Sequence, residues 1–175
     1  MTTENYLLRE IENGDISNIY LGLSDPEVTK FYDVHFDSLE ATKEQMKWYA
    51  DLKKNGTGMW WGIYNRKEDV FCGATGFNNL DINNQKAEIG FWLLKKYWGL
   101  GILKEVMPLL LKVGFNEMQL NRIEGFVVSN NVASKKVLNK SKFKHEGTMR
   151  ECELKNGERI SLDIYSLLRS EWIKS

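Results

Sequence analysis

Residues 87–112, with the sequence AEIGFWLLKKYWGLGILKEVMPLLLK, decide the fold of this chain. Residues 87–94 are apolar at nearly every position after Glu88, which predicts a central strand covered on both faces. Gly99 and Gly101 follow, and from Leu103 onward apolar residues recur at three- and four-residue spacing, which predicts a helix with one buried face. The segment therefore predicts a buried strand, a glycine turn and an amphipathic helix.

Further strands and helices are predicted on both sides of this segment. Thr42 followed by Gln45 has the spacing of a capping box, and Asn55-Gly56 is a typical stop, so we expect a helix between them. Asn156-Gly157 predicts a hairpin turn between the last two strands. The other expected strands are Tyr6–Ile11, Thr57–Tyr64, Val70–Leu80, Arg122–Val128, Phe143–Cys152 and Arg159–Leu167, and the other expected helices are Ile16–Leu23, Thr42–Lys54 and Asn130–Asn139.

The chain is expected to form a single domain over residues 1–175. Its residues are 42% hydrophobic, which is enough apolar material for one core. No low-complexity linker or internal repeat interrupts the pattern. The order of elements predicts a mixed α/β (α+β) domain with about six to seven strands. Its sheet is antiparallel at first and gains a parallel crossover after the fourth strand.

The charges balance, with 24 Lys plus Arg against 24 Asp plus Glu. A zero sum gives no reason to expect binding to nucleic acid or to a membrane surface. The longest apolar run, Val106–Leu111, is too short to span a bilayer, and residues 1–10 carry charges and no secretory signal. Cys72 and Cys152 match no metal-ligand or redox spacing, which favours two reduced thiols in a cytoplasmic protein.

Gly99 and Gly101 lie between the expected strand and the expected helix. Glycine lets the backbone come close to a ligand, and the first turn of a helix offers unpaired N–H groups and the positive end of its dipole. The loop therefore suits a phosphate or pyrophosphate group. Glycines here can also serve the turn alone. The loop lacks the lysine and hydroxyl residue of a Walker loop and the third glycine of a Rossmann fingerprint.

The loop resembles the acetyl-coenzyme A motif of the GNAT N-acetyltransferases, Q/R-x-x-G-x-G/A, with Lys96, Gly99 and Gly101 at its three positions. Lys96 departs from the usual Gln or Arg. The resemblance is closer to the ribosomal-protein N-acetyltransferase subgroup (RimJ/RimL-like), whose E-I-G-Y-W-L, Y-W-G-x-G and N-x-x-S-x-x-V-L stretches are similar to residues 88–93, 97–101 and 131–138. It implies an acetyl-CoA-dependent N-acetyltransferase with a mostly antiparallel sheet splayed between strands 4 and 5.

The resemblance also implies which residues hold acetyl-CoA. In this family the pantetheine arm pairs with the fourth strand, loop amides hold the pyrophosphate, and the Asn of N-x-x-S contacts the cofactor. Alternatively, the side chains of residues 91–93 form core, and Asn131 simply caps a helix. The expected cofactor-binding residues are Phe91, Trp92, Leu93, Leu94, Lys96, Tyr97, Trp98, Gly99, Leu100, Gly101, Ile102, Asn131 and Ser134.

Glu88 is the only charge in an otherwise apolar strand, so it must be paired, or exposed at a cleft or strand end. The resemblance implies that Glu88 is the general base, acting directly or through water. It also implies that Ser134, near the thioester sulfur, supplies the proton for the departing thiolate. The tyrosine acid of other branches corresponds to Leu138. A strand-end glutamate bonded to a neighbour is the alternative for Glu88.

Phe31, Tyr32, His35 and Phe36 cluster in the connection before the second helix, where GNAT proteins commonly form the acceptor wall. Phe31, Tyr32, His35 and Glu88 are therefore the expected substrate-binding residues. Aromatic residues that fix a loop to the core would look the same. His35 could also serve as the base in place of Glu88.

Several functions stay open for this chain. The leading one is acetyl transfer from acetyl-CoA to a primary amine, such as a protein N-terminal α-amine, by direct attack in a ternary complex, because neither cysteine lies in an activated setting. Polyamines, amino sugars and aminoglycoside-like drugs are alternative acceptors. A non-catalytic acyl-CoA-binding module and a nucleotide-binding protein are alternatives of other classes. No metal is expected, and the protein could be a monomer or a homodimer.

The zero net charge conceals an uneven distribution. Residues 95–150 contain 11 Lys plus Arg and 4 Asp plus Glu, a balance of +7. Residues 1–94 contain 9 and 15, a balance of −6. Solvated helix faces can produce such a division. A basic half also suits the phosphates of CoA, and an acidic half suits a cationic amine.

Overall fold

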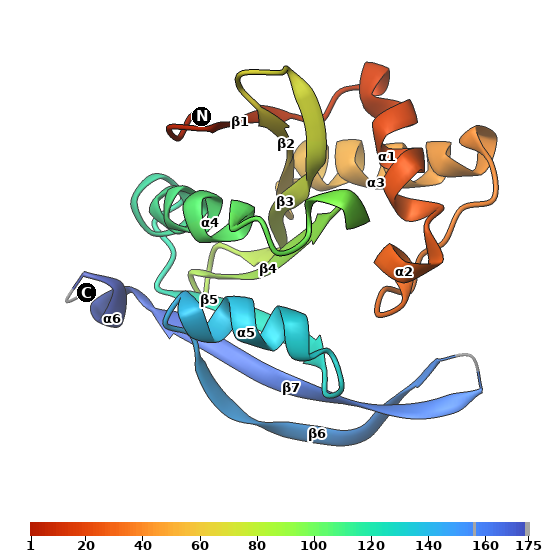
Figure 1. Ribbon diagram of the computed structural model, residues 1–175. Helices are drawn as coiled ribbons and strands as arrows, with labels where there is room; N and C mark the ends of the chain where they lie inside the picture. The colour runs from red at the N-terminus through yellow and green to blue at the C-terminus, as the bar shows by residue number, and fades with distance from the viewer. Residues whose placement is uncertain (156, 174–175) are drawn as a thin grey trace.

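The computed structural model describes residues 1–155 and 157–173 of the chain. Seven strands form one sheet in the order β1-β2-β3-β4-β5-β7-β6 (Figure 1). Neighbouring strands are antiparallel except β4 and β5, which are parallel, so the predicted fold class is confirmed. The strands are β1 (Tyr6–Glu10), β2 (Met59–Asn65), β3 (Val70–Asp81), β4 (Lys86–Leu93), β5 (Arg122–Val128), β6 (Lys144–Lys155) and β7 (Glu158–Leu168).

The sheet opens between β4 and β5. Only the first residues of the two strands pair, from Lys86 opposite Arg122 to Glu88 opposite Glu124. Beyond this point β4 continues to Leu93 beside β3 alone, while β5 continues beside β7. The predicted splay between the fourth and fifth strands is therefore present.

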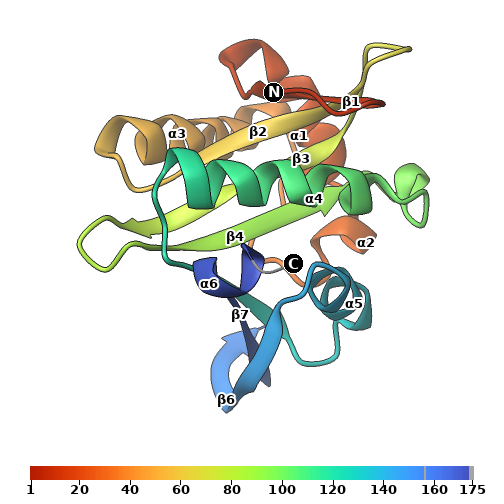
Figure 2. The same ribbon diagram turned by 90° about the vertical axis from the view of Figure 1, so that its left-hand side faces the viewer.

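Helices cover both faces of the sheet (Figures 1 and 2). One core packs α4 and α5 against the sheet, and a second core packs α1, α2 and α3 against the opposite face. None of the described helices combines the length and apolar character needed to cross a membrane. The helices are α1 (Ile16–Leu23), α2 (Pro26–Thr29), α3 (Leu39–Asn55), α4 (Ile102–Lys112), α5 (Val132–Lys140) and α6 (Arg169–Trp172), with 3-10 turns η1 (Asn13–Asp15) and η2 (Lys95–Tyr97) and the π-helical turn η3 (Val113–Glu117).

The sequence patterns do not predict α2 or α6. Each is a single turn, too short to show a periodic apolar face. Asp25 caps α2 by accepting a 2.9 Å hydrogen bond from the N–H of Glu27, so Asp25-Pro26 ends one helix and begins another. The predicted hairpin turn at Asn156 lies outside the described residues.

The predicted start of α3 is wrong. Ser38, not Thr42, is the N-cap: its Oγ accepts a 3.1 Å hydrogen bond from the N–H of Ala41. Thr42 lies inside the helix, fully buried, and its hydroxyl donates to the carbonyl oxygen of Ser38 at 2.8 Å. The predicted stop is confirmed, because Gly56 takes the left-handed conformation with φ of 67°.

The helix α5 starts two residues later than predicted. Asn131 is its N-cap, so the first helical residue is Val132 and not Asn130. After its last turn Lys142 adopts φ of 67°. A lysine in this left-handed conformation is strained compared with glycine.

We expect Ser38→Ala to lower the free energy of unfolding by about 1 kcal/mol, because the Ala41 N–H loses its side-chain acceptor. Ser38→Asp keeps an acceptor at the cap and should retain stability. Urea unfolding of the three proteins measures both effects. Equal stability of Ser38→Ala and wild type would contradict the assignment of this cap.

Candidate active site

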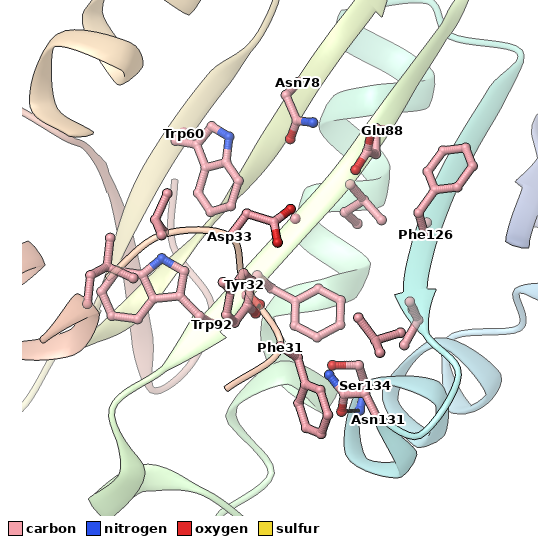
Figure 3. Close-up of a pocket in the computed structure, with 18 of the residues that line it drawn as sticks. Phe31, Tyr32, Asp33, Trp60, Asn78, Glu88, Trp92, Phe126, Asn131 and Ser134 are labelled. Atoms are coloured by element: carbon pink, nitrogen blue, oxygen red, sulfur yellow. Dashed lines mark hydrogen bonds between the residues drawn. The ribbon is translucent and has the colours of Figure 1, made fainter. Parts of the chain in front are cut away.

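A cavity of about 650 Å³ opens where β4 and β5 separate. Residues 31–36, between α2 and α3, form one wall, and α5 forms another. Figure 3 shows Glu88 from β4 and Ser134 from α5 bordering this cavity together with Phe31 and Tyr32. His35 also borders it. The fold therefore brings the residues predicted for catalysis and for acceptor binding, distant in the sequence, into one site.

Glu88 is partly buried, and its Oε2 accepts a 2.8 Å hydrogen bond from Nδ2 of Asn79. Asn79 adopts φ of 51° where the pairing of β3 with β4 becomes irregular after Asn78. Burial raises the pKa of Glu88, and the nearby carboxylates of Glu124 and Glu153 raise it further, while Asn79 and Asn78 oppose the shift. A carboxyl group with a raised pKa in a cavity is suited to proton transfer.

Carboxylates dominate the charged groups of the cavity. Asp33, Glu44, Glu88 and Glu153 border it, and no Lys or Arg does so among the described residues. Such a lining favours a positively charged ligand. In the described part of the chain, no three His, Cys, Asp or Glu side chains are grouped as a metal site requires.

The first turn of α5 presents Ser134 to the cavity. The side-chain oxygen of Asn131 accepts a 3.1 Å hydrogen bond from the N–H of Ser134, so the capping role of Asn131 is present. Lys135 anchors the same turn, because its Nζ lies 3.0 Å from Oδ2 of Asp163 on β7 and 2.6 Å from the carbonyl oxygen of Ser129. The Ser134 hydroxyl has no hydrogen-bond partner in the described residues, which leaves it available to a ligand.

The Tyr32 side chain connects the wall of the cavity to β4. Its hydroxyl donates a hydrogen bond to the carbonyl oxygen of Phe91. Burial raises the pKa of Tyr32, so the hydroxyl keeps its proton and remains a donor. From the β6–β7 hairpin, Nζ of Lys155 donates to the carbonyl oxygen of Tyr32 and lies 3.5 Å from Oδ1 of Asp33. These contacts hold the α2–α3 connection over the cleft.

His35 borders the cavity but is engaged within its own loop. Its Nδ1 lies 3.2 Å from Oγ1 of Thr29, and its Nε2 lies 3.3 Å from Oδ1 of Asp37. Both ring nitrogens therefore have partners. This arrangement favours Glu88 over His35 as the base.

The glycine loop adopts the conformation that its sequence requires. Gly99 and Gly101 have φ of 76° and 79°, where glycine is preferred, and a Cβ atom on either would meet no atom within 4 Å. The helix α4 begins after Gly101 without a side-chain cap. The N–H groups of residues 99–103 meet no acceptor among the described residues. Unpaired N–H groups at the start of a helix are suited to binding an anion.

The glycine loop lies beside the cavity and is not part of its lining. It follows the carboxyl end of β4, and α5 follows the carboxyl end of β5. Because these strands are parallel, both helices begin at the same edge of the sheet. The loop therefore lies at the open end of the cleft.

The residues predicted to bind the cofactor differ in what their side chains can reach. Phe91 borders the cavity. Trp98 and Leu100 are exposed, and Nε1 of Trp98 donates a 2.8 Å hydrogen bond to the carbonyl oxygen of Leu93. The ammonium group of Lys96 lies 4.8 Å from the centre of the Tyr97 ring. Trp92 is buried and also borders the cavity. The side chains of Leu93, Leu94 and Ile102 are buried in the core and leave only backbone atoms for a ligand.

Several residues of the cavity were not predicted from the sequence. Glu44 and Trp48 come from α3, Trp60 from β2, and Asn78 from β3. In the sequence these residues follow the pattern of an ordinary helix face or strand, so they are not recognisable as cavity residues. Only the i, i+4 spacing of Glu44 and Trp48 indicates that two of them share a face.

Comparison with known proteins gives the family of this chain. Residues 5–144 match the family model of the acetyltransferase (GNAT) domain. An uncharacterized N-acetyltransferase p20 of Bacillus licheniformis is 34% identical over 97% of this chain and 96% of its own length. A putative ribosomal N-acetyltransferase, YdaF of Bacillus subtilis, is 36% identical over 71% of this chain and 64% of its own length. The structure of RimL, a ribosomal L7/L12 α-N-protein acetyltransferase in complex with coenzyme A, has a TM-score of 0.88 at 21% identity and covers 98% of both chains.

The fold and the site define an acyltransferase built on a splayed, mostly antiparallel sheet. The chain belongs to the GNAT family of acetyltransferases. The predicted family is thereby confirmed, and with it the prediction of an acetyl-CoA-dependent N-acetyltransferase.

We expect Asn79→Gly to move the acidic limb of the pH profile of kcat/KM to higher pH. Glycine keeps the left-handed backbone but removes the donor that stabilises the Glu88 carboxylate, so the pKa of Glu88 rises and its carboxylate becomes protonated at a higher pH. Asn84→Gly is the matched control, since Asn84 donates to Asp81 in an exposed turn. If the acidic limb is unchanged in Asn79→Gly, protonation of Glu88 does not control kcat/KM.

Proposed function

We propose that this protein transfers the acetyl group of acetyl-CoA to a primary amine in a ternary complex, with Glu88 as general base and Ser134 as general acid. The observation that carries the proposal is that Glu88 and Ser134 border one cavity at the point where β4 and β5 separate. Asn79 holds Glu88 by a hydrogen bond to its carboxylate. The Ser134 hydroxyl has no partner within the described residues, so it can donate to a ligand.

The cofactor site in this proposal extends from the glycine loop into the cleft. The N–H groups of residues 99–103 would hold the pyrophosphate, helped by the dipole of α4 and by Lys96 and Lys104 nearby in sequence. The pantetheine arm would lie along residues 91–94, at the carboxyl end of β4. Asn131 and Ser134 would meet it from α5.

Acetyl-CoA supplies a thioester whose carbonyl carbon forms a bond to the amine nitrogen while its C–S bond breaks. Glu88 takes the proton that the nitrogen must lose, directly or through water. Ser134 gives a proton to the departing sulfur and regains one from solvent. A backbone N–H of β4 that faces the cleft would polarise the acetyl carbonyl.

The acceptor that we propose is a protein N-terminal α-amine, as expected for the RimJ/RimL-like subgroup. The relative named as a putative ribosomal N-acetyltransferase supports this choice. The carboxylates of Asp33, Glu44 and Glu153 would attract the protonated amine toward Glu88. Cys72 and Cys152 are both free, which fits a protein of the cytoplasm.

We expect Gly101→Glu to abolish CoA binding, because a carboxylate would enter the anion site and a side chain would occupy a left-handed position. Gly56→Glu is the matched control: it places the same side chain at a left-handed glycine with open space, at the end of α3. The readout is the thermal shift on adding CoA, acetyl-CoA, ATP or NAD. Retained CoA binding by Gly101→Glu, or an equal response to ATP and NAD, would overturn the cofactor assignment.

We expect Glu88→Gln to lower kcat by about 100-fold or more while the affinity for CoA stays within a factor of about two. Because burial disfavours the Glu88 carboxylate, removal of its charge should leave the melting temperature at pH 7 undiminished. Steady-state kinetics and thermal melts test the two statements. Unchanged kinetics with a lower melting temperature would make Glu88 a structural residue.

The acceptor class is tested by CoA release with a panel of amines: peptides with free N-termini, spermidine, glucosamine and an aminoglycoside. Acceptor-dependent release with peptides is the expected result. Tight CoA binding without turnover of any amine would favour a non-catalytic acyl-CoA-binding module.

A further inference from the structure

The indole N–H of Trp60, on β2, has no hydrogen-bond partner in the part of the chain that the structure describes. Only 8% of Trp60 is exposed. In residues 1–155 and 157–173, its Nε1 is the one buried side-chain nitrogen or oxygen that no acceptor meets. A buried donor left unpaired is costly and rare, so it needs an explanation.

The Trp60 ring extends across the sheet because two glycines leave room for it. Trp60 is paired with Gly76 on β3, and Gly76 is paired with Gly90 on β4. A Cβ atom on Gly76 would lie 2.5 Å from Cγ of Trp60, and one on Gly90 would lie 2.5 Å from its Cζ2. The ring therefore reaches the border of the cavity, whose lining also includes Asn78 and Glu88 (Figure 3).

Within the described residues this N–H forms no hydrogen bond, although it lies among aromatic rings. The rings of Trp48 and Tyr49 lie 5.8 and 5.5 Å from it, centre to centre, and present aromatic edges or faces. By contrast, Nε1 of Trp98 donates to a backbone carbonyl oxygen, and the indole of Trp92 bonds the hydroxyl of Tyr49. Among the described residues, the one buried indole without a partner is therefore the one that borders the cavity together with Glu88.

We propose that Trp60 binds an oxygen atom of the acceptor, and that the acceptor therefore carries a carbonyl oxygen close to its amine, as an α-aminoacyl group does. This inference rests on the proposed function and deepens it. The amine lies at Glu88, and the carbonyl oxygen accepts from Nε1 of Trp60. Trp60 is then a specificity-determining residue that discriminates against polyamines, whose chains contain no acceptor oxygen.

The spacing of the two groups limits the acceptor. Glu88 and Gly90 lie on the same face of β4, two residues and so on the order of 7 Å apart. A hydrogen bond spans about 3 Å between heavy atoms. A ligand that reaches both Glu88 and the ring over Gly90 must therefore join its nitrogen and oxygen by few bonds. The N–Cα–C=O unit of an N-terminal residue meets this condition.

The test compares L-alaninamide, which has the carbonyl group, with propylamine, which lacks it. We expect Trp60→Phe to reduce the ratio of their kcat/KM values about tenfold, because one hydrogen bond is lost for the amide alone. The different basicities of the two amines cancel when the ratios of variant and wild type are compared. Spermidine should be a poorer substrate of the wild type than alaninamide.

Trp61→Phe is the matched control. Trp61 is the next residue of β2, equally buried, but it belongs to the core on the other face and does not border the cavity. Its substitution should leave the ratio unchanged. An equal ratio in Trp60→Phe and wild type, or a preference for spermidine, would overturn the inference. Absence of turnover with every amine would instead overturn the proposed function.

A binding measurement decides the inference without turnover and without a variant. In protein labelled with ¹⁵N at the tryptophan indoles, alaninamide added to the CoA complex should move the Trp60 N–H proton resonance downfield. Propylamine should not. An unmoved resonance at saturating alaninamide would exclude the hydrogen bond.

Discussion

The structure depends on how early the parallel pairing of β4 and β5 ends. After Glu88 opposite Glu124 the two strands separate, which leaves backbone groups of β4 facing a cleft. Such groups need partners. The hydroxyl of Tyr32 and the indole of Trp98 satisfy two of the carbonyl oxygens, those of Phe91 and Leu93. An N–H group of β4 on this side of the strand would be available to a ligand, as the proposed mechanism requires.

The paired end of the two strands is held by charges. The guanidinium group of Arg122 donates to Glu124 at 2.6 Å and to both oxygens of Glu146 on β6, and Lys86 of β4 lies 3.4 Å from Glu124. Arg122 lowers the pKa of Glu146 to about 2. These contacts tie β4, β5 and β6 together at one end. The sheet therefore opens as a wedge that begins at Glu88, and the cavity lies between the separated strands and α5, which carries Ser134.

Local patterns predicted most of the fold. The bounds of α1 and β5 coincide with those expected from periodicity and β-propensity, and the glycine loop has the backbone that its sequence requires. The start of α3 was missed because Ser38 and Thr42 lie one turn apart and either can cap a helix. Burial of Thr42 in the core decides between them. The cavity residues Trp60, Asn78 and Glu153 could not be found in advance, since they depend on strand register and on the hairpin.

The sequence by itself determined most of the elements, the left-handed glycine turn at Gly99 and Gly101, and the family, because local patterns and motifs carry each of them. It also indicated that Glu88, as a charged residue in an apolar strand, lies at a cleft or beside a partner. Only the tertiary structure decided that partner, the placement of Glu88 and Ser134 on one cavity, and the unpaired N–H of Trp60 among the described residues. These are consequences of which strands lie side by side, where their pairing stops, and which glycines let a large ring pass. These features depend on packing between segments that are far apart in the sequence, and local sequence patterns contain no information about such packing.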